Sequence, residues 1–228
     1  LKLQNYNTND EPCNGCRANT ITHDWHNLAR DAPCQDTYWT TESWIRAKHP
    51  IQCMLFLAEY MSILAVADDW MHTVHLGIYQ WMYGSILWLS IYQTMLHTPA
   101  ANMKRLMTNI RAYYNVHTTP RKYQNLTPSM FTREDHQFPR LKGTAGEIKR
   151  LGGALLHVWE RYCTKDRVDP SFIVHQQIAL MLRWFLALDK ILDDHDPQIY
   201  PKLPHTSATE FETKCFEVLA IIKYVNQY

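Results

Sequence analysis

The stretch LKGTAGEIKRLGGALLHVWERY, residues 141–162, decides the fold class. Its apolar residues recur at the three- and four-residue spacing of one face of an α-helix. Thr98-Pro99, Thr127-Pro128 and Asp169-Pro170 mark further helix starts, because each joins a good N-cap residue to proline at the first helical position. The sequence lacks the alternating segments and hairpin dipeptides that are typical of strands. The chain is therefore predicted to be all-α.

Applied along the whole chain, the same signals predict a single domain of eight or nine helices. A polar, turn-rich tail occupies residues 1–17, and the all-α domain covers residues 18–228. Ser207 and Glu210 have the spacing of a capping box before the last helix. The expected helices lie near residues 20–32, 40–49, 51–69, 74–97, 99–115, 127–136, 144–163, 170–194 and 207–226.

The composition limits the classes of partner. In 228 residues, 23 Lys and Arg balance 22 Asp and Glu, so no strong field attracts nucleic acid or an anionic membrane. We expect no membrane anchor, since polar residues interrupt every apolar run, and a cytoplasmic location, since no signal peptide is recognisable. The six cysteines are expected to be mostly buried thiols, and the absence of a heptad seam favours a monomer. The flat residue usage, with 13 Tyr against 7 Gly, indicates an artificial or far-diverged sequence.

Two groups of residues have the chemistry of metal ligands. Cys13, Cys16, His23 and His26 offer sulfur and nitrogen donors for zinc, but their spacing differs from that of a zinc finger and favours a solvated tail beside a helix over a zinc site. The second group is acidic and consists of Asp68, Asp69, Asp189, Asp193 and Asp194. Carboxylates on paired helices chelate Mg²⁺, although a solvated helix face also accounts for them.

The acidic group resembles the two Asp-rich motifs of the isoprenoid synthase family. This resemblance implies Mg²⁺-dependent binding of a prenyl diphosphate. His72 and Lys190 stand where that family has acidic residues, and only 35 residues follow Asp193.

The start of the chain resembles the heme oxygenase family. Thr22, His26, Ala29, Asp31 and Ala32 match the pattern of that family's first helix. Four further segments match in the family's order, so that about half of the chain is covered: HTPAANMKRLMTNIRAYYN at 97–115, PRKYQNLTPSM at 120–130, AGEIKRLGGALL at 145–156 and FETKCFEVLA at 211–220. The chain departs from the family by an insertion between residues 33 and 98, and by Glu147 where the family has Asp.

This second resemblance implies a heme-oxygenase-like fold, with heme between a proximal first helix and a glycine-containing distal helix. His26 would be the iron ligand, because a neutral imidazole is a normal proximal ligand, and Thr22 and Ala29 would lie beside the heme. Gly152 and Gly153 would let the backbone approach the opposite heme face, and Glu147 would order water there. Arg183 would pair with a propionate through its two-point fork.

The implied reaction converts heme, O₂ and external electrons to biliverdin, CO and iron. A reductase or ferredoxin would be the electron-donor partner. The Mg²⁺–prenyl diphosphate reading and a helical scaffold without activity, such as a designed one, remain alternatives.

Overall fold

The computed structural model describes residues 16–19, 22, 31–40, 42, 43, 46, 70–132, 138–163, 169, 171–195 and 203–225. The chain divides into two compact units, residues 1–68 and 69–228, so the division falls inside the segment predicted as one domain. The described residues are mostly helical and contain no strand beyond an isolated bridge between Cys16 and Tyr38. The all-α prediction is confirmed at this level.

In the N-terminal unit, the described residues form a small contact around Trp39. The buried Trp39 indole donates a 2.9 Å hydrogen bond to the Cys16 carbonyl, and the Arg17 guanidinium lies 4.7 Å from the ring centroid. Residues 42, 43 and 46 are helical, within the predicted helix 40–49. Of the predicted helix 20–32, residues 31 and 32 are not helical, and they lead into the 3₁₀ turn Pro33–Asp36. The predicted helix 51–69 lies outside the described residues.

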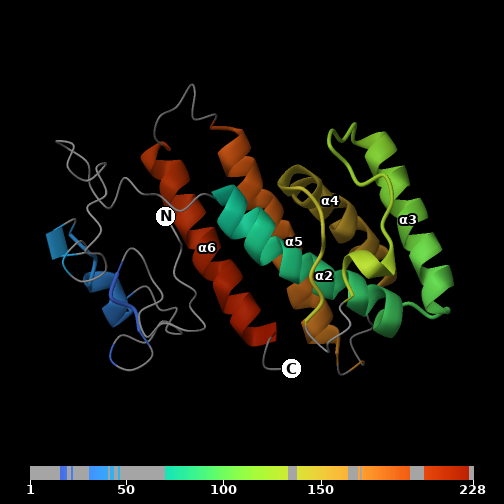
Figure 1. The fold of residues 1–228 in the computed structure, drawn as a ribbon, viewed down its shortest axis with the longest axis horizontal. Coiled ribbons are helices and arrows are strands. Elements are labelled where there is room, and N and C mark those ends of the chain that lie inside the picture. The colour runs from blue at the N-terminus through green and yellow to red at the C-terminus, as the bar shows by residue number, and fades with distance from the viewer. Residues whose placement is uncertain are drawn as a thin grey trace. The chain divides into compact units, whose positions relative to one another are not determined.

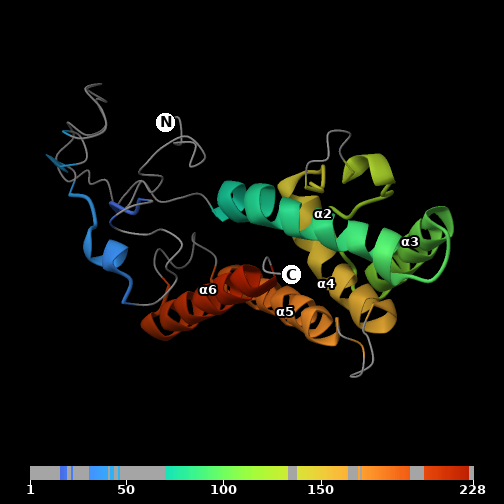
Figure 2. The same ribbon diagram turned by 90° about the horizontal axis from the view of Figure 1, so that it is seen from below.

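The C-terminal unit is a helical assembly centred on α4. Helix α4 (Ala145–Tyr162) contacts α2 (Tyr79–Leu89), α3 (Pro99–Val116) and α5 (Phe172–Asp193), and α5 also packs on α6 (His205–Val225). Figure 1 shows α3, α4, α5 and α6 following one another across this unit, with α2 crossing them, and Figure 2 shows α2 on one side of this row. The buried side chains between these helices form its core, and Trp159, Tyr79, Tyr83, Tyr114 and Phe185 are among the largest.

Two of the predicted helices begin at a side-chain cap, and the cap at Thr98 is the one that the sequence predicts. Thr98 Oγ1 accepts a hydrogen bond from the Ala101 backbone N–H and begins α3. Thr144 and Glu147 form a complete capping box at the start of α4. Both helices therefore lie where the sequence predicts them, near 99–115 and 144–163.

Two other predictions about helix starts are wrong. Of the helix expected over 127–136, the described residues 127–132 form only a 3₁₀ turn, Pro128–Met130, because the carbonyls of Met130 and Phe131 accept hydrogen bonds from Lys142 and Arg140 instead of continuing a helix. The capping box expected at Ser207 does not form. Helix α6 begins two residues earlier, at His205, and the Pro204 carbonyl closes its first turn with the Ala208 N–H.

The helix predicted over 74–97 is part of a longer run with two wide turns. Residues 71–78 and 90–94 are π-helical, and they flank α2 on either side. Met95 is extended, so the helical run ends before the predicted limit. Such wide turns are often found where a helix presents a functional residue, and the first of them carries the buried His75.

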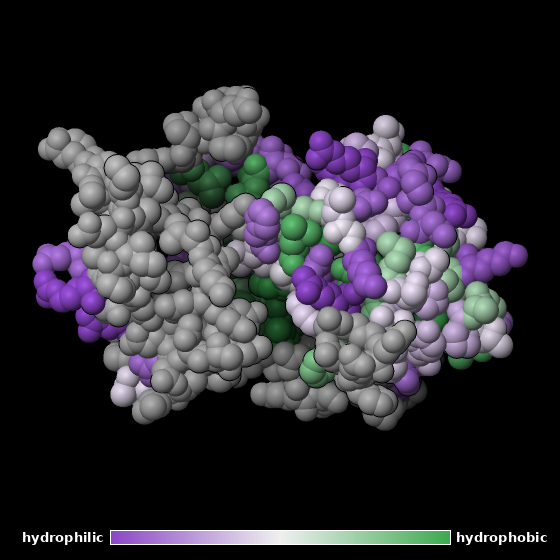
Figure 3. Space-filling view, in the orientation of Figure 1, coloured by the Kyte–Doolittle hydropathy of each residue, from purple (hydrophilic) through white to green (hydrophobic). Residues whose placement is uncertain are grey.

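The surface of the described part is mainly polar. Figure 3 shows hydrophilic residues spread over the part of this face that contains α3, with apolar residues scattered among them. Among the described residues, no helix is long and apolar enough to cross a membrane.

Candidate functional site

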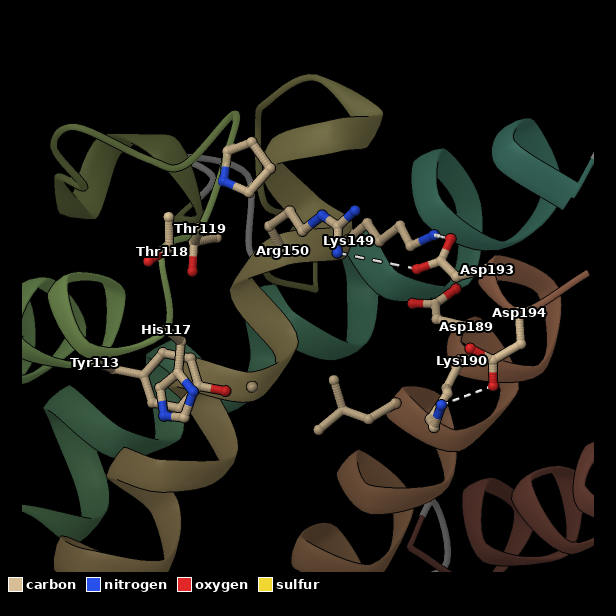
Figure 4. A pocket seen from close by; sticks show the side chains of 13 residues that line it. Tyr113, His117, Thr118, Thr119, Lys149, Arg150, Asp189, Lys190, Asp193 and Asp194 are labelled. Atoms are coloured by element: carbon tan, nitrogen blue, oxygen red, sulfur yellow. Dashed lines mark hydrogen bonds and ion pairs between the residues drawn. The ribbon is translucent and has the colours of Figure 1, made fainter. Parts of the chain in front are cut away.

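The most prominent cavity that we describe lies between α3, α4 and α5. It has a volume of about 400 Å³, within the range of roughly 300–1,000 Å³ that is usual for small-molecule sites. Figure 4 shows an aromatic pair on one side of it and a group of charged side chains on the other. Its walls are the end of α3, the loop that follows, one face of α4 and the last turns of α5, through Tyr113, His117, Thr118, Thr119, Pro120, Lys149, Arg150, Gly153, Leu186, Asp189, Lys190, Asp193 and Asp194.

Asp189 is the buried member of the acidic group. Its side chain is 6% exposed, and its Oδ1 lies 2.8 Å from His75 Nε2 and 3.4 Å from Trp70 Nε1. Its Oδ2 is buried and has no hydrogen-bond partner. A buried polar atom left without a partner costs about 1–3 kcal/mol, and more when it is charged. The pocket wall therefore includes a buried carboxylate whose hydrogen-bonding capacity is only partly used.

The outer acids are paired with cations on the pocket wall. Lys149 Nζ lies 2.5 Å from Asp193 Oδ1, and Arg150 Nη1 lies 3.9 Å from Asp193 Oδ2. Lys190 Nζ lies 2.6 Å from Asp194 Oδ2, one helical turn away. These side chains are partly exposed, and exposed pairs of this kind contribute little to stability. Breaking these ion pairs to bind another charged group therefore costs little free energy.

Two buried tyrosines extend the polar group inward from Asp189. Burial, together with the Asp189 charge, raises the pKa of Tyr79 and of Tyr83 well above the usual value. The Tyr79 hydroxyl donates to the Phe185 carbonyl at 3.1 Å, whereas the Tyr83 hydroxyl has no partner. Burial therefore favours the protonated form of both phenols.

The opposite wall is aromatic and ends in a loop with unusual backbone angles. The rings of Tyr113 and His117 stack with centroids 4.1 Å apart and 28° between their planes. Thr118 and Arg121 have φ of 41° and 49°. Left-handed backbone is unfavourable for residues with a β-carbon, and such strain concentrates at functional sites.

The predicted distal residues lie on α4, where tyrosines occupy the space beside both glycines. A β-carbon on Gly152 would lie 2.6 Å from the Tyr83 hydroxyl, and one on Gly153 would overlap the Tyr113 hydroxyl. Close helix–tyrosine packing thus accounts for the glycine pair. Glu147 accepts hydrogen bonds from the Thr144 N–H and hydroxyl as part of the capping box.

The other predicted heme-site residues have local partners or lie outside the described residues. Arg183 is exposed and pairs with Glu160 at 2.5 and 3.1 Å. Thr22 exchanges hydrogen bonds with Asn19 in the N-terminal unit. His26 and Ala29 lie outside the described residues, so the predicted iron ligand stays a prediction.

Most of the predicted zinc and magnesium ligands also lie outside the described residues, so these two sites stay predictions. Cys13, His23, Asp68 and Asp69 lie outside the described residues. Within the described ranges, no three His, Cys, Asp or Glu side chains are grouped so as to hold a metal ion by themselves. Four cysteines that we describe are thiols: Cys16 and Cys163 are buried, and Cys34 and Cys215 are partly buried.

Sequence reasoning missed the basic and aromatic walls of the pocket. Lys149 and Arg150 had a usable signal, because they lie four and three residues before Gly153, on the α4 face that carries this glycine. His117 had no such signal, since it follows the end of α3 and reaches the pocket only through the turn of the chain after Val116.

Comparisons with protein-family models, with curated proteins and with solved structures found no match to this chain.

Proposed function

We propose that the pocket binds a small molecule carrying a diphosphate group, together with Mg²⁺. The observation that carries this proposal is the buried Asp189, which lines the pocket together with Asp193, Lys149 and Arg150 and whose Oδ2 accepts no hydrogen bond in the structure. A cation at this wall would compensate the buried carboxylate. The neighbouring basic side chains would compensate the anionic group that accompanies the cation.

The two carboxylates of this wall suit Mg²⁺, which takes several ligands from water and substrate, better than a metal ion whose ligands all come from protein. Asp189 and Asp193 are one helical turn apart, so both carboxylates are on the same face of α5. Proteins commonly hold Mg²⁺ through one or two carboxylates, with waters and substrate phosphates as the remaining ligands. The lack of a third protein ligand among the described residues is compatible with such a site. When bound, the ion would neutralise phosphate charge.

The ion pairs on the pocket wall could exchange partners when a ligand binds. Lys149 and Arg150 both face Asp193, so the wall is neutralised internally before a ligand arrives. A ligand with its cation would take over both partners: the basic side chains would bind phosphate oxygens, and Asp193 would face the cation. Arg150 suits phosphate because its planar fork donates at two points.

The proposal agrees with the resemblance to the Asp-rich motifs of isoprenoid synthases, of which one lies on the pocket wall. The pocket differs from that motif at Lys190. Because Lys190 pairs with Asp194, Asp189 and Asp193 remain as the two acids that a cation could bind. The motif at Asp68 and Asp69 ends directly before Trp70, whose indole donates to Asp189.

Isothermal titration calorimetry with inorganic pyrophosphate tests this proposal. We expect binding in the presence of Mg²⁺ and little binding with EDTA. Asp189→Asn keeps the shape of the side chain and removes its charge, and it should weaken Mg²⁺–pyrophosphate binding by about 10- to 100-fold, the effect of one interaction with a charged group. Glu160→Gln is the matched control on α4, because Glu160 does not line the pocket. Equal affinity of these two variants would contradict the proposal.

Heme oxygenation is a second candidate, based on the family resemblance, and one observation favours it: Gly153, a predicted distal residue, lies on the pocket wall together with basic side chains suited to propionates. His26 would hold the iron, and a reductase or ferredoxin would supply electrons for conversion of heme to biliverdin. Addition of hemin tests it. A Soret band of a histidine-ligated heme that is lost in His26→Ala supports this function, and the spectrum of free hemin would exclude it.

A further inference from the structure

We infer that the organic part of the diphosphate ligand is a flat ring with polar edges, as in a nucleoside diphosphate, and not a prenyl chain. This inference rests on the proposed function, because it concerns the other end of the same pocket. The evidence is the aromatic pair of Tyr113 and His117, its loop, and the scarcity of aliphatic surface.

The pocket wall offers little to a hydrocarbon chain. Among its thirteen lining residues, Leu186 is the single open-chain aliphatic side chain, and six are formally charged. A prenyl chain gains affinity in proportion to the apolar area that it buries. A wall of this composition would leave most of such a chain against polar groups.

The aromatic wall, in contrast, suits a planar ring. His117 stacks on Tyr113 and is itself exposed, so its imidazole is accessible from the pocket. Tyr113 packs on α4, because its hydroxyl lies in the space beside Gly153 that a β-carbon would fill. The glycine on α4 thus leaves room for the aromatic wall.

The loop after α3 supplies hydrogen-bonding groups beside the rings. Thr118 and Thr119 both line the pocket, and Figure 4 shows them next to the Tyr113–His117 pair and away from Asp193 and Asp194. Thr118 holds a left-handed backbone with φ of 41°. Hydroxyl and backbone groups at this place can read the polar edge of a base, whereas the stacking surface accepts any base.

The charged and aromatic ends are thus separate parts of one cavity. A molecule with phosphates at one end and a base at the other matches both ends at once. Pyrophosphate would engage only the charged end, and a nucleoside without phosphate would engage only the aromatic end.

Calorimetry with a matched series of ligands tests the inference. In Mg²⁺ we expect ADP or GDP to bind on the order of tenfold more tightly than pyrophosphate, the effect of one stacked base, and geranyl diphosphate to bind no more tightly than pyrophosphate. His117→Ala should remove the advantage of the nucleotide and leave pyrophosphate affinity unchanged. His97→Ala, at an exposed histidine outside the pocket, is the control and should change neither affinity.

The outcomes separate the two proposals. If pyrophosphate binds but nucleoside diphosphates bind no more tightly, or if geranyl diphosphate binds most tightly, the inference of a ring is wrong and the diphosphate site stands. If pyrophosphate fails to bind while adenosine binds and loses affinity in His117→Ala, the ring subsite stands and the proposed function is wrong. If neither pyrophosphate nor any nucleotide binds, both are wrong. Far-UV circular dichroism of His117→Ala verifies its fold.

Discussion

Two sets of residues at the meeting of α4 and α5 have the same three residue types and opposite surroundings. The inner set, Asp189, Tyr83 and Gly152, is buried, and of its members only Asp189 also lines the pocket, whereas all of the outer set, Asp193, Tyr113 and Gly153, is partly exposed and borders the pocket. In each set, a glycine on α4 receives a tyrosine hydroxyl. In the inner set these contacts fix the packing of α2, α4 and α5, and in the outer set they form a wall that a ligand can reach. The same residue types thus differ in their burial, and we expect them to differ in their contribution to stability.

The largest expected difference between the two sets concerns the carboxylates. Asp189→Ala should lower the free energy of unfolding by about 3 kcal/mol, because a buried hydrogen bond to a charged group is lost and His75 remains without its partner. Asp193→Ala should lower it by no more than about 1 kcal/mol, since its ion pairs are exposed. Urea unfolding measures both values. Equal losses in the two variants would remove the distinction between an inner and an outer set.

A second test uses the pH dependence of stability. Because burial raises the pKa of Tyr83 and Tyr79 in the folded state, their contribution is complete below the unfolded-state pKa near 10 and is lost as the pH rises above it. Each tyrosine should lower the free energy of unfolding by about 1.4 kcal/mol per pH unit above that point.

Tyr83→Phe isolates the contribution of one tyrosine. Since the Tyr83 hydroxyl has no partner, the variant should be nearly as stable as the wild type at pH 7 and should lose stability less steeply above pH 10. Urea unfolding at several alkaline pH values gives both slopes. The same slope for the two proteins would contradict the protonated, buried state of Tyr83.

The smallest expected effect concerns the glycines. Gly152→Ala should cost about 1 kcal/mol or slightly more, because its β-carbon would lie 2.6 Å from the fixed Tyr83 hydroxyl, and overpacking outweighs the gain in helix propensity. Gly153→Ala should cost less, since Tyr113 is half-buried and can move toward the pocket.

A double-mutant cycle assigns the cost of Gly152→Ala to its cause. In the Tyr83→Phe background the clashing oxygen is gone, so the alanine should become neutral or stabilising by up to about 1 kcal/mol. Thermal or urea unfolding of the four proteins measures the coupling. Additive effects would show that something other than Tyr83 limits the space beside Gly152.

The sequence was most informative where local signals and packing agree. Thr98-Pro99 placed the start of α3, and the apolar periodicity of residues 141–162 placed α4, because the local signal and the buried face agree in both helices. The segment at Thr127-Pro128 has the same local signal, but its carbonyls bond to the chain at 140–142, a contact that no local pattern reveals. Tertiary hydrogen bonds overrode the helix signal in that segment.

The site was predictable only in part, for a similar reason. The acids of α5 stand out by their spacing, and so does the glycine pair of α4. Their surroundings do not: that Tyr83 and Tyr113 fill the space beside the glycines, and that His75 holds Asp189, depends on how separate helices meet. The same glycines are compatible with a bound cofactor or with close packing until the neighbouring side chains are known.

The wide turn at Met71–Ile78 makes this segment unusually tolerant of the loss of one codon. His75 and Tyr79 lie on either side of Gly77 in the sequence, and both face α5 through Asp189 and Phe185. A wide turn holds about one residue more than an α-helical turn, so deletion of Gly77 would let the segment close to a regular α-helix with His75 still directed toward Asp189. Deletion of one residue inside the regular helix α2 would instead rotate residues 71–78 by about 100° relative to the rest of α2. That second deletion would damage the site from a distance, while the sequence of every pocket-lining residue stayed intact.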